Sequence, residues 1–341
     1  MDALPLRGAL RDMPQKGSKP RVAVMRRVRT ISLFSGCGGS DLALEASGFH
    51  IVWANDVWDR ACETYADNIP DAMIECGDIR DVPRFPSAQL LVGCYPCQGF
   101  TQGGRRESDD NINYLYQEFD RALRYVLPRA FIVENVAGMA YGKNRELLEN
   151  QLRRYRLAGY HVKWSVLNAQ DFGVAQDRKR LFIVGVRSDL EKTYEFPEPT
   201  HGPERDKAYI TQRDVLTGLP EWPIGEFTDQ TLNWYYMSRK RRADWDEPSS
   251  CIVGNWRHVP LHPLSPPLRR IHTDKWVFQH RGRTRRFAYK ECAALQGFPT
   301  AFKFEQGSIR DRFQMIGNAV PPPLFASVVG GLNHILHVAN G

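Results

Sequence analysis

Short apolar runs alternate with amphipathic stretches along residues 28–187. The runs are rich in branched and aromatic side chains, and most are followed by glycine, asparagine or acidic residues, as is typical of buried strands. We predict strands at 30–34, 51–54, 90–92, 130–133 and 181–186. The intervening stretches predict helices from Gly39 through Ser47, up to Asn68 and over about 113–127. This alternation predicts an α/β fold with a doubly wound, mostly parallel sheet.

The pattern changes after residue 187. Ten of the 22 prolines and five of the eight tryptophans lie within 188–285, where periodicity is weak. Such a stretch predicts a separate, loop-rich domain. Regular patterns return with an expected helix at 289–296 and a last helix after the prolines at 321–323. The predicted division is a basic N-terminal arm at 1–27, a larger domain at 28–187 and 286–341, and a smaller domain at 188–285.

Composition narrows the class of protein. Hydrophobic residues make up 42% of the 341 residues, enough for a substantial core, and no apolar run approaches the length of a membrane span. The N-terminus lacks the apolar segment of a secretory signal. Seven cysteines without framework spacing fit free thiols in a reducing compartment. We therefore expect a cytoplasmic protein with no membrane partner.

The charge distribution points to a polyanionic partner. The net charge is +7 and the isoelectric point is near 9.0. In the smaller domain, arginine runs are interleaved with tryptophan and tyrosine, which favours nucleic-acid binding over a merely solvated face. Candidate contacts are Arg239, Arg257 and Arg283.

A glycine-rich turn joins the first expected strand to the first expected helix. Gly36, Gly38 and Gly39 would let the backbone approach a nucleoside-type cofactor. Asp41 stands where a dinucleotide fingerprint needs its third glycine, which argues against a nicotinamide cofactor. Taken alone, this run is equally compatible with a tight structural turn.

Two carboxylates at strand ends favour the cofactor interpretation. Asp56 closes the second strand, twenty residues after Gly36, where a carboxylate can accept both ribose hydroxyls. Asp78 ends a third extended segment at the same edge and could face an adenine amino group. With the glycine turn, these spacings favour S-adenosylmethionine.

Further polar and reactive side chains follow or precede the other strands. Pro96-Cys97-Gln98 places a thiol in a loop at the carboxyl edge of the sheet. Glu134 ends the next strand, where an ordinary strand-end cap is the alternative interpretation. Gln176, Arg178 and Arg180 alternate along an extended segment, and we expect the three side chains to line one pocket.

With these runs in this order, the chain resembles the C5-cytosine-specific DNA methyltransferase family of the bacterial restriction–modification type. The matching runs are Phe34 to Gly39, Pro96-Cys97-Gln98, Glu134-Asn135-Val136, Gln176-x-Arg178-x-Arg180, Lys290 to Pro299 and Gly317-Asn318-Ala319-Val320. The resemblance implies a Rossmann-like catalytic domain at 28–187 and 286–341. It makes 188–285 the target-recognition domain, and it matches 99–113 to the family's mobile catalytic loop.

The resemblance also implies a covalent mechanism. Cys97 would add to C6 of a cytosine flipped out of duplex DNA, so that C5 can accept a methyl group. Glu134 would hold N3 and the exocyclic amine, Arg180 would contact the carbonyl, and Arg178 would shape the pocket. Gln98 would contact the DNA. The resemblance therefore implies double-stranded DNA as the binding partner. By analogy with the family, a cognate restriction endonuclease would be a functional partner.

The resemblance implies that S-adenosylmethionine is the cofactor, that S-adenosylhomocysteine is the product formed from it, and that no metal is needed. The implied cofactor residues are Phe34, Gly36, Gly38, Gly39, Asp56, Val57, Asp78, Ile79, Asn318 and Val320. One departure is that Asp56 stands where relatives often carry glutamate, which shortens the reach to the ribose.

Other classes compete with this interpretation. Cys94-Tyr95-Pro96-Cys97 has the spacing of a redox dithiol or half a zinc site, but neither context is present in the sequence. A tRNA cytosine-5 methyltransferase would share the catalytic runs. Those relatives usually carry Cys-Phe-Thr where this chain has Cys251-Ile252-Val253. A catalytically inactive DNA-binding homologue is the third alternative, and the intact catalytic residues argue against it.

Overall fold

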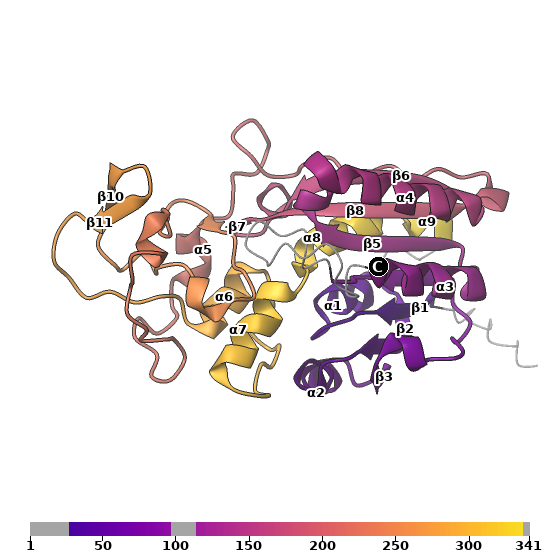
Figure 1. The fold of residues 1–341 in the computed structure, drawn as a ribbon, viewed down its shortest axis with the longest axis horizontal. Coiled ribbons are helices and arrows are strands. Elements are labelled where there is room, and N and C mark those ends of the chain that lie inside the picture. Colours follow the sequence, from indigo (N-terminus) through magenta and orange to yellow (C-terminus); the bar gives the residue numbers. More distant parts are fainter. Residues whose placement is uncertain (1–26, 97–113, 337–341) are drawn as a thin grey trace, which may run out of the picture.

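The computed structural model of the chain describes residues 27–96 and 114–336 (Figure 1). The predictions for Cys97, Gln98, the loop at 99–113 and the arm up to residue 26 lie outside the described residues. Within the described part, seven strands form one sheet in the order β3-β2-β1-β4-β5-β8-β6. A smaller lobe of short elements lies beside this sheet.

Five neighbouring strands of the large sheet run parallel, and the last two pair antiparallel with their neighbours. The strands are β1 (Arg29–Leu33), β2 (His50–Asp56), β3 (Met73–Cys76), β4 (Leu90–Gly93), β5 (Ala130–Val136), β6 (Tyr160–Asn168) and β8 (Lys179–Arg187). The prediction of a mostly parallel, doubly wound sheet is confirmed.

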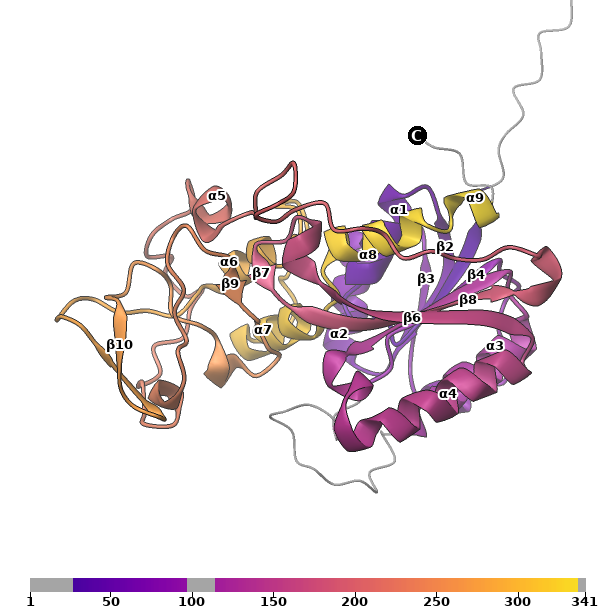
Figure 2. The ribbon, with the colours of Figure 1, turned by 90° about the horizontal axis from the view of Figure 1, so that it is seen from above.

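Helices cover both faces of the sheet (Figure 2). On one face lie α1 (Gly39–Ala46), α8 (Pro322–Gly330) and α9 (Asn333–Leu336), and on the other α3 (Tyr116–Val126) and α4 (Arg145–Leu157). The helix α2 (Asp59–Asn68) connects β2 to β3.

The apolar character of β4 follows from its burial on both faces. Leu90 and Val92 belong to the core beneath α1 and α8, whereas Leu91 belongs to the core beneath α3 and α4. Successive side chains of a strand point to opposite faces, so a central strand covered by helices on both sides favours a nearly continuous apolar run. The run that predicted β4 reflects this preference.

The smaller lobe has its own core. It contains α5 (Gln212–Leu216), the short strand β9 (Ser249–Ser250) and the hairpin β10 (Leu268–His272) with β11 (Lys275–Phe278). The C-terminal helices α6 (Tyr289–Leu295) and α7 (Ile309–Asn318) supply buried side chains to the same core (Figure 1). The domain boundaries at 187/188 and 285/286 stay a prediction, but this packing shows that the segment after 285 supports the smaller lobe.

The predicted strands correspond to β1, β2, β4, β5 and β8, and the predicted helices correspond to α1, α2, α3, α6 and α8. The strand β6 and the helices α4 and α7 were not predicted. Gly317 and Asn318, the first residues of the run Gly317-Asn318-Ala319-Val320, end α7, and the last predicted helix starts after that run. Among the described helices, none has the length and apolar character needed to cross a membrane.

Candidate active site

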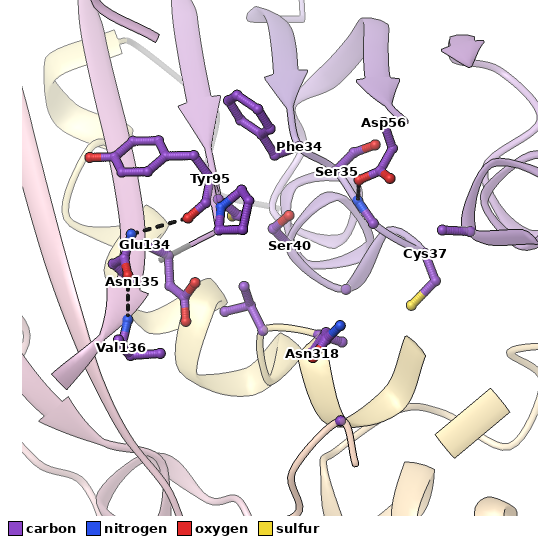
Figure 3. Close-up of a pocket in the computed structure, with 18 of the residues that line it drawn as sticks. Phe34, Ser35, Cys37, Ser40, Asp56, Tyr95, Glu134, Asn135, Val136 and Asn318 are labelled. Carbon is purple, nitrogen blue, oxygen red and sulfur yellow. Dashed lines mark hydrogen bonds between the residues drawn. The ribbon is translucent and has the colours of Figure 1, made fainter. Parts of the chain in front are cut away.

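A cavity of about 980 Å³ opens at the carboxyl edge of the parallel strands. Its wall combines the glycine-rich turn after β1, the end of β2, Pro96 after β4, the end of β5 and the start of β8. The smaller lobe and the segment between α7 and α8 complete the wall. Figure 3 shows Phe34 and Asp56 on one side of this space and Glu134 on the other.

The turn between β1 and α1 has an unusual backbone. Phe34, Gly36 and Gly38 all have positive φ, of 57°, 54° and 95°. Such values are uncommon for a residue with a side chain, and they cluster where the surrounding structure imposes a functional geometry. The cavity is lined by Phe34, Gly36 and Gly39 from this turn, whereas Gly38 packs against Ile69 and Tyr65 of the α2 region.

Gly39 is required for a different reason. A Cβ atom on Gly39 would lie 2.6 Å from the carbonyl oxygen of Val320, so the start of α1 can pack here only without a side chain. Val320 is buried and Asn318 is exposed, and both line the cavity beside the turn. The structure thus brings the C-terminal candidates to the N-terminal glycine run.

Asp56 is held in place by the backbone on both sides of it. Its Oδ2 accepts the Gly36 N–H at 2.8 Å and its Oδ1 accepts the Trp58 N–H at 2.9 Å. Burial raises the pKa of this carboxyl, and the backbone N–H groups oppose that shift. Each oxygen keeps a second lone pair, so the oriented carboxylate can still accept hydroxyl groups from the cavity.

Asp78 and Val57 occupy the outer part of the same wall. The Asp78 carboxylate accepts from the Arg80 N–H and from the Arg80 guanidinium, which lowers the pKa of Asp78. Ile79 is buried and touches the cavity, and Val57 lines it with a side chain that is 67% exposed. An exposed valine at a cavity wall offers an apolar surface to a flat ligand.

On the opposite wall, Glu134 at the end of β5 forms an ion pair with Arg180 at the start of β8. The Arg180 Nε lies 3.0 Å from Oε1 of Glu134, and the two side chains are 14% and 9% exposed. Antiparallel pairing places Val136 opposite Arg180, which brings the two side chains together. Burial raises the pKa of Glu134, while Arg180 and Arg178 oppose that rise.

The structure corrects the expectation that three alternate side chains line one pocket. Arg180 lines the cavity, but Gln176 and Arg178 are fully buried and absent from its wall. The reason is that the segment is not one strand: β7 (Gln176–Asp177) pairs with β9 of the smaller lobe, and β8 begins afterwards. The alternation of side-chain directions expected within one strand does not extend across the break between β7 and β8.

Arg178 instead joins three segments beneath the cavity. Its guanidinium donates to the carbonyl oxygens of Ile252, Gly317 and Ala319 at 2.6, 2.8 and 2.9 Å. Burial lowers the pKa of Arg178 to about 10. Gln176 accepts the Ile252 N–H at 2.9 Å and so ties the same segment of the smaller lobe. Both residues shape the cavity from below without touching its space.

Hydrogen bonds hold Tyr95, the residue that precedes the Pro96-Cys97-Gln98 run, in place. The Asn135 side chain donates to the Tyr95 carbonyl at 3.1 Å (Figure 3). The Tyr95 hydroxyl donates to Gln151 of α4 at 2.5 Å. Pro96 therefore reaches the cavity wall from a fixed position, and Cys97, the next residue, lies outside the described residues.

Two described thiols of this region, Cys94 and Cys37, are poorly suited to nucleophilic chemistry. Cys94 lies in the cavity wall, and burial raises its pKa well above the usual range of a thiol. Burial likewise raises the pKa of Cys37 to about 12. A thiol that resists ionisation is a poor nucleophile.

The arginines proposed from charge lie on the smaller lobe. Arg239 and Arg257 are exposed, and Arg283 stacks over Trp222 at 3.7 Å from the ring centroid. None of the three lines the cavity. Among the described residues, no group of three or more histidine, cysteine or acidic side chains is arranged to hold a metal ion.

Several wall residues were missed by the sequence reasoning. Val253, Gly254 and Gln314 line the cavity, and Cys251 had been considered only as a departure from a tRNA-type run. A Cβ on Gly254 would lie 2.3 Å from Oδ1 of Asn318, so the smaller lobe can approach the cofactor side this closely only without a side chain there. No motif marks these positions, because their role depends on contact between distant segments.

Comparison with known proteins gives a consistent assignment. The model of the family described as C-5 cytosine-specific DNA methylase matches residues 28–334. The chain is 38% identical to the Type II methyltransferase M.BsuRI of Bacillus subtilis, over 89% of this chain and 78% of that protein. It is 36% identical to the Type II methyltransferase M.BspRI of Lysinibacillus sphaericus, over 86% and 79%. Its fold is similar to the crystal structure of the S. pombe Dnmt2 methyltransferase, with a TM-score of 0.66 at 20% identity over 91% of this chain and 99% of that one.

Proposed function

The chain belongs to the C-5 cytosine-specific DNA methylase family and is a DNA cytosine-5-methyltransferase. From this premise we propose that it flips a target cytosine out of duplex DNA and methylates C5 through a covalent Cys97 adduct. We further propose that it serves as the modification enzyme of a restriction system. The observation that carries the mechanism is that one cavity joins the glycine turn and Asp56 to the Glu134–Arg180 pair and to Pro96.

The cavity supports binding of S-adenosylmethionine. Its volume of about 980 Å³ lies within the usual range for ligand pockets, about 300–1,000 Å³. Asp56 has free lone pairs for ribose hydroxyls, Val57 and Ile79 offer apolar surface, and the turn at Phe34 to Gly39 exposes backbone. Asn318 and Val320 would close the same site. S-adenosylmethionine, when bound, supplies a methyl group on a positively charged sulfur.

Arg80 modifies the proposal for Asp78. Its guanidinium pairs with the Asp78 carboxylate, so an adenine amino group would have to use the remaining lone pairs or displace Arg80. We therefore propose Asp56 as the main carboxylate that contacts the cofactor. Asp78 stays a proposed contact, but a weaker one, because its carboxylate is paired with Arg80.

The opposite wall supports the handling of the cytosine ring. Glu134, kept neutral more readily because burial raises its pKa, would hold the exocyclic amine and give its proton to N3. Arg180 would donate to the carbonyl oxygen while holding Glu134 in position. Arg178 would act as a positioning residue, since its guanidinium contacts backbone carbonyls rather than the cavity.

The proposed covalent step starts at the Cys97 thiolate. The thiolate forms a bond to C6 while N3 takes the proton of Glu134, which leaves C5 electron-rich. Once C5 carries the methyl group, a base, which we take to be water, removes the C5 proton. The C6–sulfur bond then breaks, Cys97 leaves as thiolate, and Glu134 recovers its proton. The role of Cys97 rests on its motif and on the position of Pro96.

The first test measures transfer of labelled methyl groups from S-adenosylmethionine to unmethylated genomic DNA, with total tRNA in parallel, followed by bisulfite sequencing. Label on DNA at one short sequence is expected. Label on tRNA alone would overturn the substrate, and label on neither would favour the inactive binding protein. The variant Cys97→Ala serves as the control and is expected to lose transfer while retaining cofactor binding. Retained turnover would contradict the covalent step.

A further inference from the structure

Two arginines from distant parts of the chain meet over one tryptophan. The guanidinium carbon of Arg257 lies 4.7 Å from the centroid of the Trp256 ring, and that of Arg310 lies 4.6 Å from the same centroid. Arg257 belongs to the smaller lobe, whereas Arg310 is the second residue of α7. Both arginines are exposed, so their N–H edges face solvent.

This cluster lies next to the active-site cavity. Gly254, two residues before Trp256, is part of the cavity wall, and so is the exposed Gln314 of α7. Residues four apart on a helix share a face, so Arg310 lies one turn before Gln314 on the same side of α7. A nucleic acid whose target base enters the cavity would pass over these side chains.

The positive charge of the cluster is uncompensated. Among the residues that the structure describes, neither Arg257 nor Arg310 forms an ion pair. The carboxylate adjacent in sequence, Asp311, instead caps α7 by accepting from the N–H and the hydroxyl of Ser308 at 2.7 Å. A cation in the first turn of a helix is also disfavoured by the helix dipole. Two such charges at one site therefore lower stability unless an anion binds there.

More arginines lie near this cluster, some of them exposed and others buried beneath it. Burial lowers the pKa of His258, and Arg241, Arg239, Arg286 and Arg257 lower it further, which shows how closely these charges gather around the ring. Tyr235, whose ring centroid lies 5.6 Å from that of His258, adds an exposed aromatic face.

The chemistry of the cluster suits a phosphodiester. Stacking on an indole uses the flat face of a guanidinium and leaves its in-plane N–H groups free to bind two oxygens of one phosphate. Two arginines on one ring bring two cations to one site, which suits the closely spaced charges of a DNA strand better than a single base edge, which takes one arginine.

We propose that Arg257 and Arg310, held by Trp256, bind the DNA backbone beside the flipped cytosine. The two arginines come from segments far apart in the chain, the turn at Trp256 and the helix α7, which pack together in the smaller lobe. Acting together, they would hold this lobe on one strand. This proposal rests on the proposed function for its substrate. It adds a phosphate site formed by two distant segments and assigns Arg310 and Trp256 a role in it.

The test measures the affinity of the full chain for duplex DNA at a series of salt concentrations, with S-adenosylhomocysteine present. One duplex carries the recognition sequence found by bisulfite sequencing, in its unmethylated form. A second duplex differs from it at a single base pair. Arg310→Gln and Arg257→Gln are each expected to weaken binding to both duplexes by about tenfold at moderate salt. Each should reduce the slope of log Kd against log salt by about 0.9. Arg310→Lys should keep most of the slope, because it keeps the charge.

Arg29→Gln is the matched control. Arg29 is an exposed arginine at the first position of β1, at the opposite end of the parallel strands from the cavity. It should leave both affinity and slope unchanged. Thermal unfolding and cofactor binding of every variant should match those of the wild type.

Two outcomes would overturn the proposal. An unchanged salt slope in Arg310→Gln would exclude a phosphate contact. A weakened preference for the correct duplex over the altered one would assign the arginine to a base edge instead. Since binding is measured without turnover, the proposal is separable from the function. If the wild type binds duplexes and the variants change the salt slope as expected, but the wild type methylates nothing, the proposed function alone is overturned. If the wild type binds no duplex, both proposals are overturned.

Discussion

Asp41 is a buried carboxylate in the first turn of α1. It accepts from the hydroxyls of Ser32, Ser40 and Tyr65 at 2.8, 3.2 and 2.7 Å, yet burial raises its pKa to about 6. A carboxyl whose folded-state pKa is raised stabilises the fold below its unfolded pKa, and that stability is lost as pH rises through the folded pKa. Asp41 therefore opposes folding most at neutral pH.

The variant Asp41→Asn has no carboxyl to titrate and so removes this contribution to the pH dependence of the unfolding free energy. Relative to the variant, the wild type should lose about 3 kcal/mol of unfolding free energy between about pH 4 and about pH 7. Denaturant unfolding of both proteins across this range measures the difference. Parallel pH profiles would contradict a raised pKa at Asp41.

In the proposed mechanism, Glu134 is the residue that gives a proton to N3 of the cytosine. Glu134→Gln keeps the size and hydrogen-bonding capacity of the side chain but cannot give a proton to N3. We expect kcat to fall by about 10²–10⁴-fold, the usual contribution of a general acid, with cofactor binding unchanged. Methyl transfer at saturating DNA and cofactor measures this loss. A decrease smaller than about threefold would remove Glu134 from the proton transfer.

At the scale of elements, α1 and the α7–α8 segment depend on a close approach at Gly39. In Gly39→Ala the new Cβ would clash with the Val320 carbonyl, 2.6 Å away, and would separate two walls of the proposed cofactor site. We expect a loss of about 1–3 kcal/mol in unfolding free energy and a raised KM for S-adenosylmethionine. Denaturant unfolding and steady-state kinetics measure the two effects.

Gly330→Ala is the matched control for that prediction. Gly330 is the last residue of α8, and a Cβ at this position would meet open space, with no neighbouring side chain within 4 Å. The substitution should leave KM unchanged and stability equal or slightly higher. An equal rise in KM for both variants would mean that the contact at Gly39 is not the cause.

The elements that the sequence analysis missed share a physical feature. In α4, charged residues dominate, and the buried positions are confined to Leu148, Gln151, Leu152 and Tyr155. β6 is an edge strand of mostly half-buried side chains. Helix and strand signals from apolar periodicity are weak where one face alone is partly buried. The central strands were predictable because each carries a short run of mostly apolar residues buried on both faces.

At the scale of the whole molecule, Arg178 connects the two lobes. Its guanidinium binds Ile252 of the smaller lobe and Gly317 and Ala319 beside the cofactor wall. In Arg178→Lys the charge is kept but the planar fork that reaches several carbonyls is lost. We expect unfolding free energy to fall by about 1–3 kcal/mol, because buried carbonyl groups lose their donors.

Catalysis should respond as well, since Arg178 sets the position of both walls. KM for DNA and for S-adenosylmethionine should both rise in Arg178→Lys. The same substitution at the exposed Arg153 of α4, Arg153→Lys, should change neither. Steady-state kinetics of the two variants provide the comparison. A change confined to kcat would argue for a direct contact with substrate instead.

The sequence by itself determined the central strands, the family and the order of the chemical groups. Central strands buried on both faces are mostly apolar, and a glycine turn, strand-end carboxylates and Pro96-Cys97-Gln98 are local signals that a single strand or loop carries. The tertiary structure alone decided which groups share the cavity. Arg178 faces carbonyls and Arg180 faces Glu134 because β7 pairs with the smaller lobe while β8 pairs with β5. Likewise Arg310 meets Arg257 over Trp256, since such contacts depend on packing between segments far apart in the chain.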